Sequence, residues 1–481
     1  MFCILTVKQA DFFCFFRGLC YICGHFVDNL MMIEKRKSRQ SLFYRSVRTY
    51  LYYLHDCFLY KKIHRIGKRN IPADGTPVLL VSNHQNCLCD PLLVLMAIRD
   101  RMINVFVRAD VFKIHPLITK IFHKLAMNPA YRLDFDGKEQ IWKNRDMFKN
   151  VETKLLDGGM VMMYPEGRHQ NKHWLGDLSH GYTKLAFETA ELGQFQKEIW
   201  ILPCCHHYSS YRDIQQEVVI KFGKPVSIKP YYELYQDKPR TAQRQVNELV
   251  REQLLRLMLH IPDLDNYKAI DFIRNTYGYH YAKKNGFWES YLPEKLQADK
   301  MLVEDLQYAK DEDAEFVQAI YEDALTYERE LKKLKVRDRQ FDKTPGWFPA
   351  GMSLIALVAL FPLWVFSLWP NILVYKLPEL AMRRVRDKMF FNSFLLGISA
   401  VITMPLLYSL SFVLAWIFVN VWVALIYAIA LPWLGLFAYY YWRFAVRTWQ
   451  DIRFLCVAKT KAGRMVRDLR KNLFERLNKI G

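Results

Sequence analysis

The chain has 481 residues, a formal net charge of +20 at neutral pH and 15% aromatic residues. Such a composition is typical of chains that bind nucleic acid or an anionic lipid surface. No nucleic-acid-binding module is recognisable, and long apolar stretches favour the membrane, so we expect a phospholipid membrane as partner and no nucleic acid. The ten cysteines follow no secreted disulfide pattern, and Cys20-Tyr21-Ile22-Cys23 has no second Cys-x-x-Cys partner, so no disulfide framework or zinc site is predicted.

The N-terminal region is predicted in two parts. Residues 1–40 form an extension in which charged residues interrupt the apolar runs and no cleavage site follows, so it is neither a span nor a signal peptide. A start of translation at Met31 or Met32 would remove most of it. Residues 42–63 carry many aromatic side chains with basic residues towards the ends, which predicts an amphipathic helix. This helix either lies at the membrane interface or packs on the sheet.

The first segment with chemistry follows a predicted strand. Residues 76–80 are apolar, β-branched and bounded by turn residues, which indicates a buried strand. His84 comes shortly after it, and Asp90 lies six positions further on. A carboxylate that holds one imidazole nitrogen in the N–H tautomer leaves the other free to take a proton from a hydroxyl. The pair therefore predicts a general base that needs no serine or cysteine nucleophile.

A second polar cluster follows another predicted strand. The run Gly158-Gly159-Met160-Val161-Met162-Met163 leads into Tyr164-Pro165-Glu166-Gly167-Arg168-His169. Because α/β folds keep their ligand sites along one edge of the sheet, we expect the polar side chains of both clusters to lie together there.

Residues 41–231 are assigned to this α/β domain, and residues 232–345 to a separate helical region with many charges. From Leu296 to Ala309 the apolar positions recur on one face of a helix, and residues 327–334 mix both signs of charge. We assign no chemistry to this region.

Residues 346–443 are predicted to enter the membrane. Phe390 to Trp442 contains no charged residue and is long enough for two spans of ~20 residues each, with a turn near Ser409-Leu410-Ser411 or near Asn420. Residues 347–375 are also apolar, but prolines interrupt them. Basic clusters precede, separate and follow the two apolar stretches, and residues 444–481 form a basic tail on the cytoplasmic side. If all these clusters are cytoplasmic, the 347–375 stretch must enter and leave on the same side, as a re-entrant hairpin.

Several blocks across about residues 60–230 resemble the glycerolipid acyltransferase superfamily and occur in the family's order. Asn83-His84 with Asp90 is similar to its first block, and Pro165-Glu166-Gly167 with Arg168 is similar to its third. Two further segments, Arg108-Ala109-Asp110-Val111-Phe112 and Pro129-Ala130-Tyr131-Arg132, are similar to the second block. The fourth block and the closing strand are matched by Ile201-Leu202-Pro203 and by residues 218–226.

The resemblance implies a mixed β-sheet flanked by helices, an α/β fold, and acyl transfer by direct attack. His84 would be the general base and Asp90 would orient it. The substrate-binding residues that the resemblance implies are Asn83, Arg132, Glu166, Gly167 and Arg168. The arginines would contact a phosphate through charge-assisted hydrogen bonds. The alternatives are a surface ion pair for Arg132 and a buried structural carboxylate for Glu166.

The sequence departs from the usual pattern at two places. Five residues separate His84 from Asp90 instead of the commoner four, a spacing similar to that of fungal-type glycerol-3-phosphate and dihydroxyacetone-phosphate acyltransferases. The usual Glu-Gly-Thr-Arg is replaced by Glu166-Gly167-Arg168-His169, so the arginine comes one position early and its role is open.

The resemblance therefore implies an integral membrane O-acyltransferase of phospholipid biosynthesis, with its catalytic domain on the cytoplasmic face, at the inner membrane if the source is bacterial. The co-substrate would be an acyl-CoA or acyl-carrier-protein thioester, without cofactor or metal. The acceptor would be glycerol-3-phosphate, dihydroxyacetone phosphate or lysophosphatidate. Two alternatives are a non-catalytic membrane tether and a metal-dependent phospholipid hydrolase. In the hydrolase, the metal ligands would be His84, Asp90, His169, His173 and His206.

Overall fold

The structure is a computed structural model that describes residues 40–113, 115–131, 143–167, 169, 171–385 and 388–480. The predicted N-terminal extension lies outside the described residues except for Gln40. The described residues form two compact units. The first comprises residues up to Met258 together with 381–397, and the second comprises residues 259–380 together with those from Ile398 onwards.

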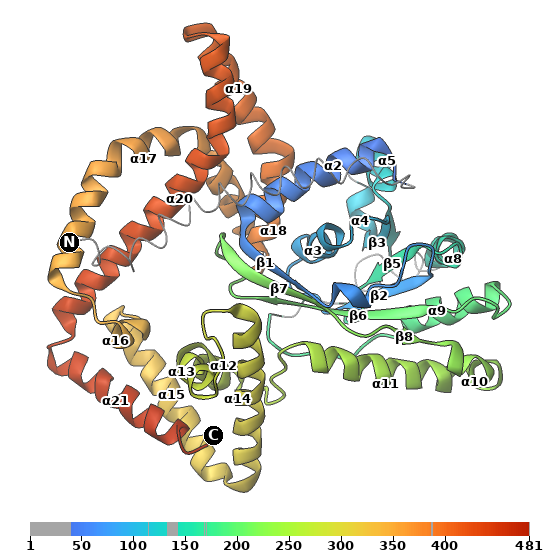
Figure 1. The fold of residues 1–481 in the computed structure, drawn as a ribbon, viewed down its shortest axis with the longest axis horizontal. Coiled ribbons are helices and arrows are strands. Elements are labelled where there is room, and N and C mark those ends of the chain that lie inside the picture. Colours follow the sequence, from blue (N-terminus) through green and yellow to red (C-terminus); the bar gives the residue numbers. More distant parts are fainter. Residues whose placement is uncertain are drawn as a thin grey trace. The chain divides into compact units, whose positions relative to one another are not determined.

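The first unit is built on an eight-stranded mixed sheet in the order β1-β7-β6-β2-β5-β3-β4, with β8 paired to β6. Figure 1 shows α3 on one side of this sheet and α11 on the other. The strands are β1 Tyr60–Ile66, β2 Val78–Ser82, β3 Ile103–Arg108, β4 Met127–Ala130, β5 Met160–Met163, β6 Trp200–Tyr208, β7 Gln216–Phe222 and β8 Val226–Ser227. The predicted mixed sheet flanked by helices is therefore confirmed.

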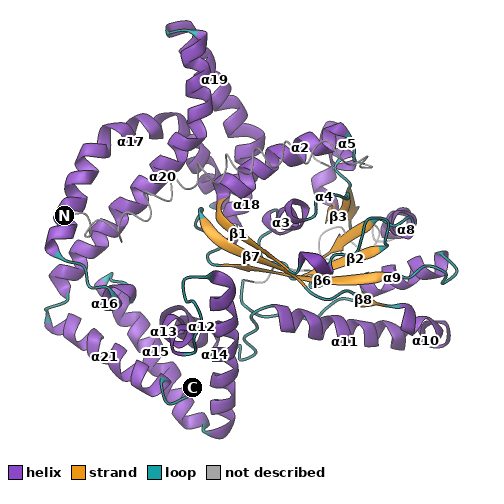
Figure 2. Cartoon of the chain, in the orientation of Figure 1, coloured by secondary structure: helices purple, strands orange, loops and turns teal. Residues whose placement is uncertain are grey.

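The helices of the first unit surround the sheet (Figure 2). The α-helices are α2 Leu42–Tyr52, α3 Cys89–Ala97, α4 Ala109–Phe112, α5 Pro116–Lys124, α8 Lys143–Leu156, α9 Gly181–Leu192, α10 Tyr232–Asp237, α11 Pro239–Leu257 and α18 Phe391–Ile398. Shorter helical turns are η1 Tyr53–Leu59, η2 Lys68–Asn70, η3 Lys229–Tyr231 and η4 Lys388–Phe390.

The centre of the sheet is fully buried, which explains the apolar run of the predicted strand at β2. Leu79 and Val81 point to one face, where they join Val161 of β5, Leu185 of α9 and Val250 of α11 in a core with no exposed surface. Val78 and Leu80 are also fully buried. Since successive side chains of a strand point to opposite faces, both faces of β2 need apolar residues.

The strand directions decide where polar side chains can meet. β2 is parallel to β5 and β6, with Val81 opposite both Met163 and Pro203. β6 and β7 are antiparallel, and β1 is parallel to β7. The carboxyl ends of β2, β5 and β6 therefore point to one edge of the sheet, and those of β1 and β7 point the opposite way.

The helix predicted for residues 42–63 is shorter than expected. The chain is helical from Leu42 to Leu59 through α2 and η1, but β1 then begins at Tyr60, which is opposite Gln216 of β7. Residues 60–63 are therefore strand, because pairing with β7 overrides their helical pattern. Tyr44 of α2 is buried while Leu42 remains 79% exposed. One face of the helix thus packs on the unit and the other does not.

The limits of the first unit also differ from those predicted for the α/β domain. The domain was expected to end at residue 231, but α10 and α11 belong to the first unit, which reaches Met258. α11 supplies Val246, Val250 and Leu254 to the core beneath the sheet. The segment 381–397 returns to this unit from far along the chain, which the assignment of 346–443 to the membrane did not anticipate.

The second unit is entirely helical in its described residues. Its α-helices are α12 Tyr267–Thr276, α13 Gly278–Lys284, α14 Leu292–Glu312, α15 Ala314–Leu334, α16 Arg339–Asp342, α17 Trp347–Met382, α19 Met404–Phe418, α20 Val421–Val457 and α21 Lys461–Leu477, and η5 Ser399–Thr403 precedes α19. Helical structure was predicted for residues 232–345 and is observed. The basic tail is also helical, and α21 packs on α15, where Arg476 forms an ion pair of 2.8 Å with Asp323.

Three helical segments of this chain are long and apolar enough to cross a membrane: Trp347–Met382, Phe391–Phe418 and Val421–Val457. The last two are joined at Asn420, whose side chain caps α20 by accepting a hydrogen bond from the Val423 amide. This is one of the two turn positions that the sequence allowed. The other apolar stretch is a single helix, α17, so the predicted break into a hairpin is wrong.

α17 continues through Pro362, Pro370 and Pro378. Proline is tolerated in apolar helices when neighbouring helices and side chains satisfy the freed backbone groups. Hydrogen bonds also join α17 to α20. Tyr441 donates a hydrogen bond to the carbonyl of Leu357 at 2.9 Å, and Trp364 donates one to Ala438 at 3.2 Å.

Candidate active site

The predicted imidazole–carboxylate pair is formed. His84 follows the end of β2, and its Nδ1 lies 2.8 Å from Oδ2 of Asp90, which stands in the first turn of α3. The Asp90 side chain is fully buried and that of His84 is 16% exposed. No other described residue forms a hydrogen bond with Nε2 of His84. The histidine thus has one nitrogen held by a carboxylate and one available to a substrate.

Asp90 is also bound by its own loop and by the neighbouring strand. Its Oδ2 accepts hydrogen bonds from the backbone amides of Gln85 at 2.7 Å and Asn86 at 2.8 Å. Its Oδ1 accepts one from the hydroxyl of Tyr208 at 2.5 Å. Burial alone would raise the pKa of Asp90, but the hydrogen bond from His84, the electrostatic interaction with the His206 and His84 imidazoles and the hydrogen bond from Tyr208 hold it well below its usual value. Asp90 is therefore a carboxylate at neutral pH.

Glu166 joins the two polar clusters, as the sequence predicts for the sheet edge. Its Oε1 accepts a hydrogen bond from the backbone amide of His84 at 3.2 Å, and its Oε2 accepts one from the amide of Gly176 at 3.0 Å. Gly167 follows in the left-handed region with φ +63°, which favours glycine. The Pro-Glu-Gly turn therefore ends beside the His84–Asp90 pair, on the same edge of the sheet.

The environment of Glu166 raises the pKa of its carboxyl group. Burial raises its pKa to about 7, although the hydrogen bonds from the Gly176 and His84 amides and the charge of Arg251 oppose this rise. Arg251 does not reach the carboxylate directly, since its guanidinium donates to the carbonyl of Gly176 at 2.7 Å. Glu166 thus has the structural contacts that the sequence left as an alternative, but with backbone amides in place of an arginine.

Asn83, which was predicted to bind substrate, is also bound within the domain. Its side chain is 1% exposed, and its amide forms two hydrogen bonds with the backbone of His206, accepting at 2.8 Å and donating at 3.1 Å. These contacts occupy both ends of the amide. Asn83 therefore fastens the end of β2 to β6 and positions the next residue, His84.

Two aromatic rings lie against the imidazole of His84. The Tyr164 ring is stacked with a centroid separation of 3.8 Å, and the His169 ring lies at 3.9 Å. Phe390, at the end of η4, lies 4.5 Å from His169. These rings limit the rotation of His84, because neither χ angle can change without displacing a neighbour.

The remaining predicted site residues are placed as follows. Arg132 and Arg168 lie outside the described residues, so their contacts with substrate stay predictions. Arg108, from the second block, ends β3 and forms an exposed ion pair of 2.7 Å with Asp110. In the described ranges, no group of three His, Cys, Asp or Glu side chains is arranged to hold a metal ion.

Two contributors to the site were not predicted. Tyr208 and His206 both lie in β6, which continues to Tyr208: His206 was predicted only as a metal ligand of the hydrolase alternative, and no role was predicted for Tyr208. Residues 206 and 208 share one face of the strand, and on it Tyr208 donates to Asp90 while Nε2 of His206 lies 3.2 Å from the Asp90 carbonyl. Their spacing of two was the available signal, but the strand was expected to end near Pro203.

The second unpredicted contributor is Ser393 of α18. Its Oγ accepts a hydrogen bond from the amide of Cys89 at 3.1 Å and lies 2.9 Å from the Asn86 carbonyl and 2.8 Å from the Asn86 side-chain oxygen, either of which can accept its proton. Ser393 is 3% exposed. Asn392 beside it donates to the carbonyl of Asp213 at 3.2 Å. The start of an apolar helix is thus bound to the loop between His84 and Asp90.

This combination defines a class of protein: an α/β domain that presents an oriented histidine at a sheet edge. The model of the acyltransferase family matches residues 62–207, a range that contains His84, Asp90 and Glu166. An uncharacterised acyltransferase of the yeast Schizosaccharomyces pombe is 26% identical over 197 residues. That match covers 40% of this chain and 28% of the yeast protein.

A solved structure is also similar. It is the 1-acyl-sn-glycerophosphate (LPA) acyltransferase PlsC of Thermotoga maritima, with 16% sequence identity and a TM-score of 0.32. The likeness covers 50% of this chain and 93% of the bacterial one.

Proposed function

We propose that this protein is a membrane-bound O-acyltransferase that moves a fatty acyl group from a thioester to a hydroxyl of a phosphorylated glycerol. The observation that carries the proposal is the 2.8 Å hydrogen bond between His84 Nδ1 and a fully buried Asp90. It fixes the Nδ1–H tautomer, which leaves a lone pair on Nε2 as the base. The family of the domain supports acyl transfer as the reaction.

The reaction needs one proton transfer in each direction. Nε2 of His84 takes the proton of the acceptor hydroxyl while that oxygen attacks the thioester carbonyl. The C–S bond then breaks, and the thiolate leaves with the proton from the imidazolium. Asp90 stays ionised, since its pKa lies well below the usual value, and it stabilises the positive imidazolium between the two steps. No covalent acyl-enzyme is required.

The acceptor is proposed to carry a phosphate, as glycerol-3-phosphate, dihydroxyacetone phosphate or lysophosphatidate do. Arg132 and Arg168 are the proposed phosphate ligands, because guanidinium groups bind phosphate in a bidentate manner. Gly167 is proposed to allow the acceptor close to the backbone. Glu166 is assigned an indirect part, since its carboxylate holds the backbone of His84.

The three apolar helices are compatible with membrane association, and membrane embedding would bring lipid substrates to the domain. We place the catalytic domain on the cytoplasmic face, because basic clusters flank each apolar stretch. The donor is proposed to be acyl-CoA or acyl-carrier protein, both of which are found on that face.

An acceptor comparison tests the function. The full-length protein in detergent would be given labelled acyl-CoA with glycerol-3-phosphate or lysophosphatidate in parallel. We expect label in one acylated product, and a loss of about 10²–10⁴-fold in rate for His84→Ala, the cost of removing a positioned base. His180→Ala, which removes an exposed histidine at the start of α9, is the matched control. Labelling of neither product, or full activity of His84→Ala, would refute the function.

A further inference from the structure

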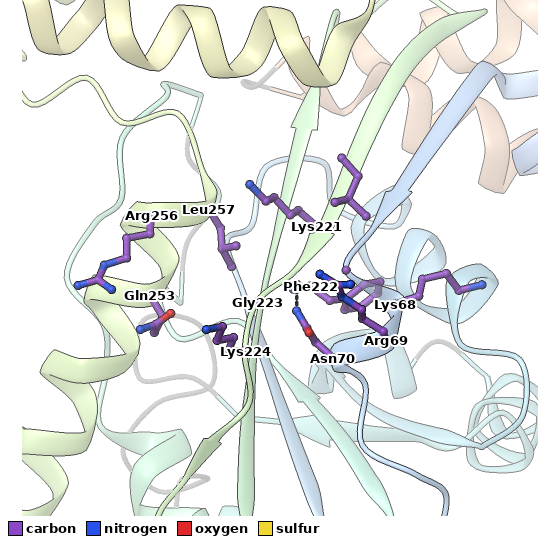
Figure 3. Close-up of a pocket in the computed structure, with 12 residues that line it drawn as sticks. Lys68, Arg69, Asn70, Lys221, Phe222, Gly223, Lys224, Gln253, Arg256 and Leu257 are labelled. Carbon is purple, nitrogen blue, oxygen red and sulfur yellow. Dashed lines mark hydrogen bonds between the residues drawn. The ribbon is translucent and has the colours of Figure 1, made fainter.

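A second concave site lies in the first unit, away from the catalytic pair. It is a cavity of about 830 Å³ between the carboxyl ends of β1 and β7 and the last turn of α11. No aspartate or glutamate lines it. Its lining includes five cationic side chains, which are Lys68, Arg69, Lys221, Lys224 and Arg256. In Figure 3, Lys221 and Lys224 lie between the Arg69–Asn70 segment and the end of α11.

The walls of this pocket are held together at fixed points. Gly67 has φ +75°, and a Cβ there would be 2.2 Å from the carbonyl oxygen of Phe222, so only glycine permits this approach of β1 to β7. Asn70 donates a hydrogen bond of 3.0 Å to the same carbonyl. A Cβ on Gly223 would come within 2.9 Å of Leu257 on α11. The backbone positions that carry the basic side chains are therefore held close together.

The position of the pocket separates it from acyl transfer. β1 and β7 run antiparallel to β6 and β2. Their carboxyl ends, which carry the pocket, point away from the edge where β2 ends at His84. A ligand in this pocket would not occupy the place of the acceptor at His84.

The charges of the pocket are largely uncompensated. Arg256 lies 3.8 Å from the carboxylate of Glu252. In the described part of the chain, none of the other four cations has a carboxylate within 4 Å. Burial and the nearby charges of Arg65 and Arg99 lower the pKa of Lys68. A bound anion would remove the repulsion that the fold imposes on these groups.

We propose that this pocket binds a phosphate-bearing ligand at a site separate from the catalytic one. Lysine heads act as point charges for phosphate, and a guanidinium adds directed hydrogen bonds. A cavity of about 830 Å³ is in the size range of small-ligand sites. The phosphate belongs either to a lipid headgroup or to a soluble phosphorylated compound, and both present the same chemistry to Lys221 and Lys224.

The test uses the full-length protein and two probes. Inorganic pyrophosphate, measured by calorimetry, represents the soluble source, and nanodiscs with phosphatidic acid, compared with nanodiscs of phosphatidylcholine alone, represent the lipid source. The variant is Lys221→Glu with Lys224→Glu. The control is Lys229→Glu with Lys238→Glu, which makes the same change of charge at exposed positions outside the pocket.

We expect the pocket variant to bind one of the probes about tenfold more weakly or worse, because two charge-assisted contacts are reversed. We expect the control to bind within about twofold of the parent, since exposed charges at a distance are screened. Acyl transfer without probe should be unchanged in both variants. Two results would overturn the proposal: neither probe binds the parent, or the control variant loses as much affinity as the pocket variant.

Discussion

The contact between α18 and the catalytic loop leads to a prediction for Ser393→Ala. The change removes one hydroxyl from a helix that lies 304 residues from the loop in the sequence. The amide of Cys89 then keeps its hydrogen bond of 2.8 Å to the Asn86 carbonyl, but the side-chain oxygen of Asn86 loses the Ser393 hydroxyl. Both residues belong to the loop that separates His84 from Asp90, so the disturbance reaches the catalytic pair through the backbone.

The size of the effect follows from burial. Ser393 is 3% exposed, so water cannot replace the hydroxyl without entering the packed interface. A buried polar group left unsatisfied, here the side-chain oxygen of Asn86, costs about 1–3 kcal/mol. The loop can recover part of this by shifting, and a misplacement of about 1 Å at a catalytic group costs about 10²-fold in rate. We therefore expect kcat to fall by about 10- to 100-fold, with a smaller change in KM for the acyl donor.

The assay is steady-state acyl transfer by the full-length protein, together with its thermal unfolding. Ser393→Thr keeps the hydroxyl and should recover most of the rate. Ser409→Ala removes an exposed serine from the same apolar segment and should leave kcat unchanged. A kcat for Ser393→Ala equal to that of the parent would refute the reasoning. So would a loss that Ser393→Thr shares in full, because the hydroxyl would then not be the cause.

Four further predictions concern the catalytic edge. Asp90→Asn should lower kcat by about 10⁴-fold, as losing the orienting carboxylate does in a serine protease; a circular dichroism spectrum checks that the fold survives. Tyr208→Phe removes the hydroxyl that donates to Asp90 and should lower stability by about 1–3 kcal/mol in denaturant unfolding. Asn83→Ala should lower the melting temperature and kcat while KM for the acceptor stays near the parental value, because its amide binds the His206 backbone and the Ser82 hydroxyl; a large rise in KM alone would indicate that Asn83 binds the acceptor. Glu166 binds its proton more tightly in the folded protein than in the unfolded one, because its pKa is about 7 in the folded protein. The free energy of unfolding should therefore fall as pH rises from about 4.5 to 7. Glu166→Gln should make the free energy of unfolding less dependent on pH in this range.

The contact between His84 and Asp90 could be predicted because its determinants are local. The strand, the histidine and the aspartate follow one another within residues 78–90, and the rules of α/β sheets then bring Glu166 to the same edge. Ser393 could not be found in this way. It contacts Asn86 across 307 positions of sequence, and only an uncharged Asn-Ser pair inside an apolar run marked it. Tyr208 was missed for a different reason, since the strand was expected to end near Pro203.

The predicted hairpin in residues 347–375 shows where pattern and packing diverge. Prolines normally mark a break, because they lack an amide and clash with the preceding turn. In α17 the breaks do not form, and partners from α20 contact the helix, such as the carbonyl of Gly435, which accepts a hydrogen bond of 3.0 Å from Tyr375. A single sequence does not reveal those partners. Residues 232–258 were likewise assigned to the charged helical region because of their many charged residues. The apolar residues on one side of α11 instead pack in the core beneath the sheet.

The packing of α21 on α15 limits how many times the chain between these two helices can cross a bilayer. α15 precedes the three apolar helices and α21 follows them, yet Arg476 and Asp323 form an ion pair and Arg470 binds Asp338 at 2.7 Å. Segments in contact share one compartment, so the chain between them must traverse the lipid an even number of times. Three candidate helices therefore supply two full passages or none. Any part of the chain between α15 and α21 that crosses the bilayer must therefore cross back before α21.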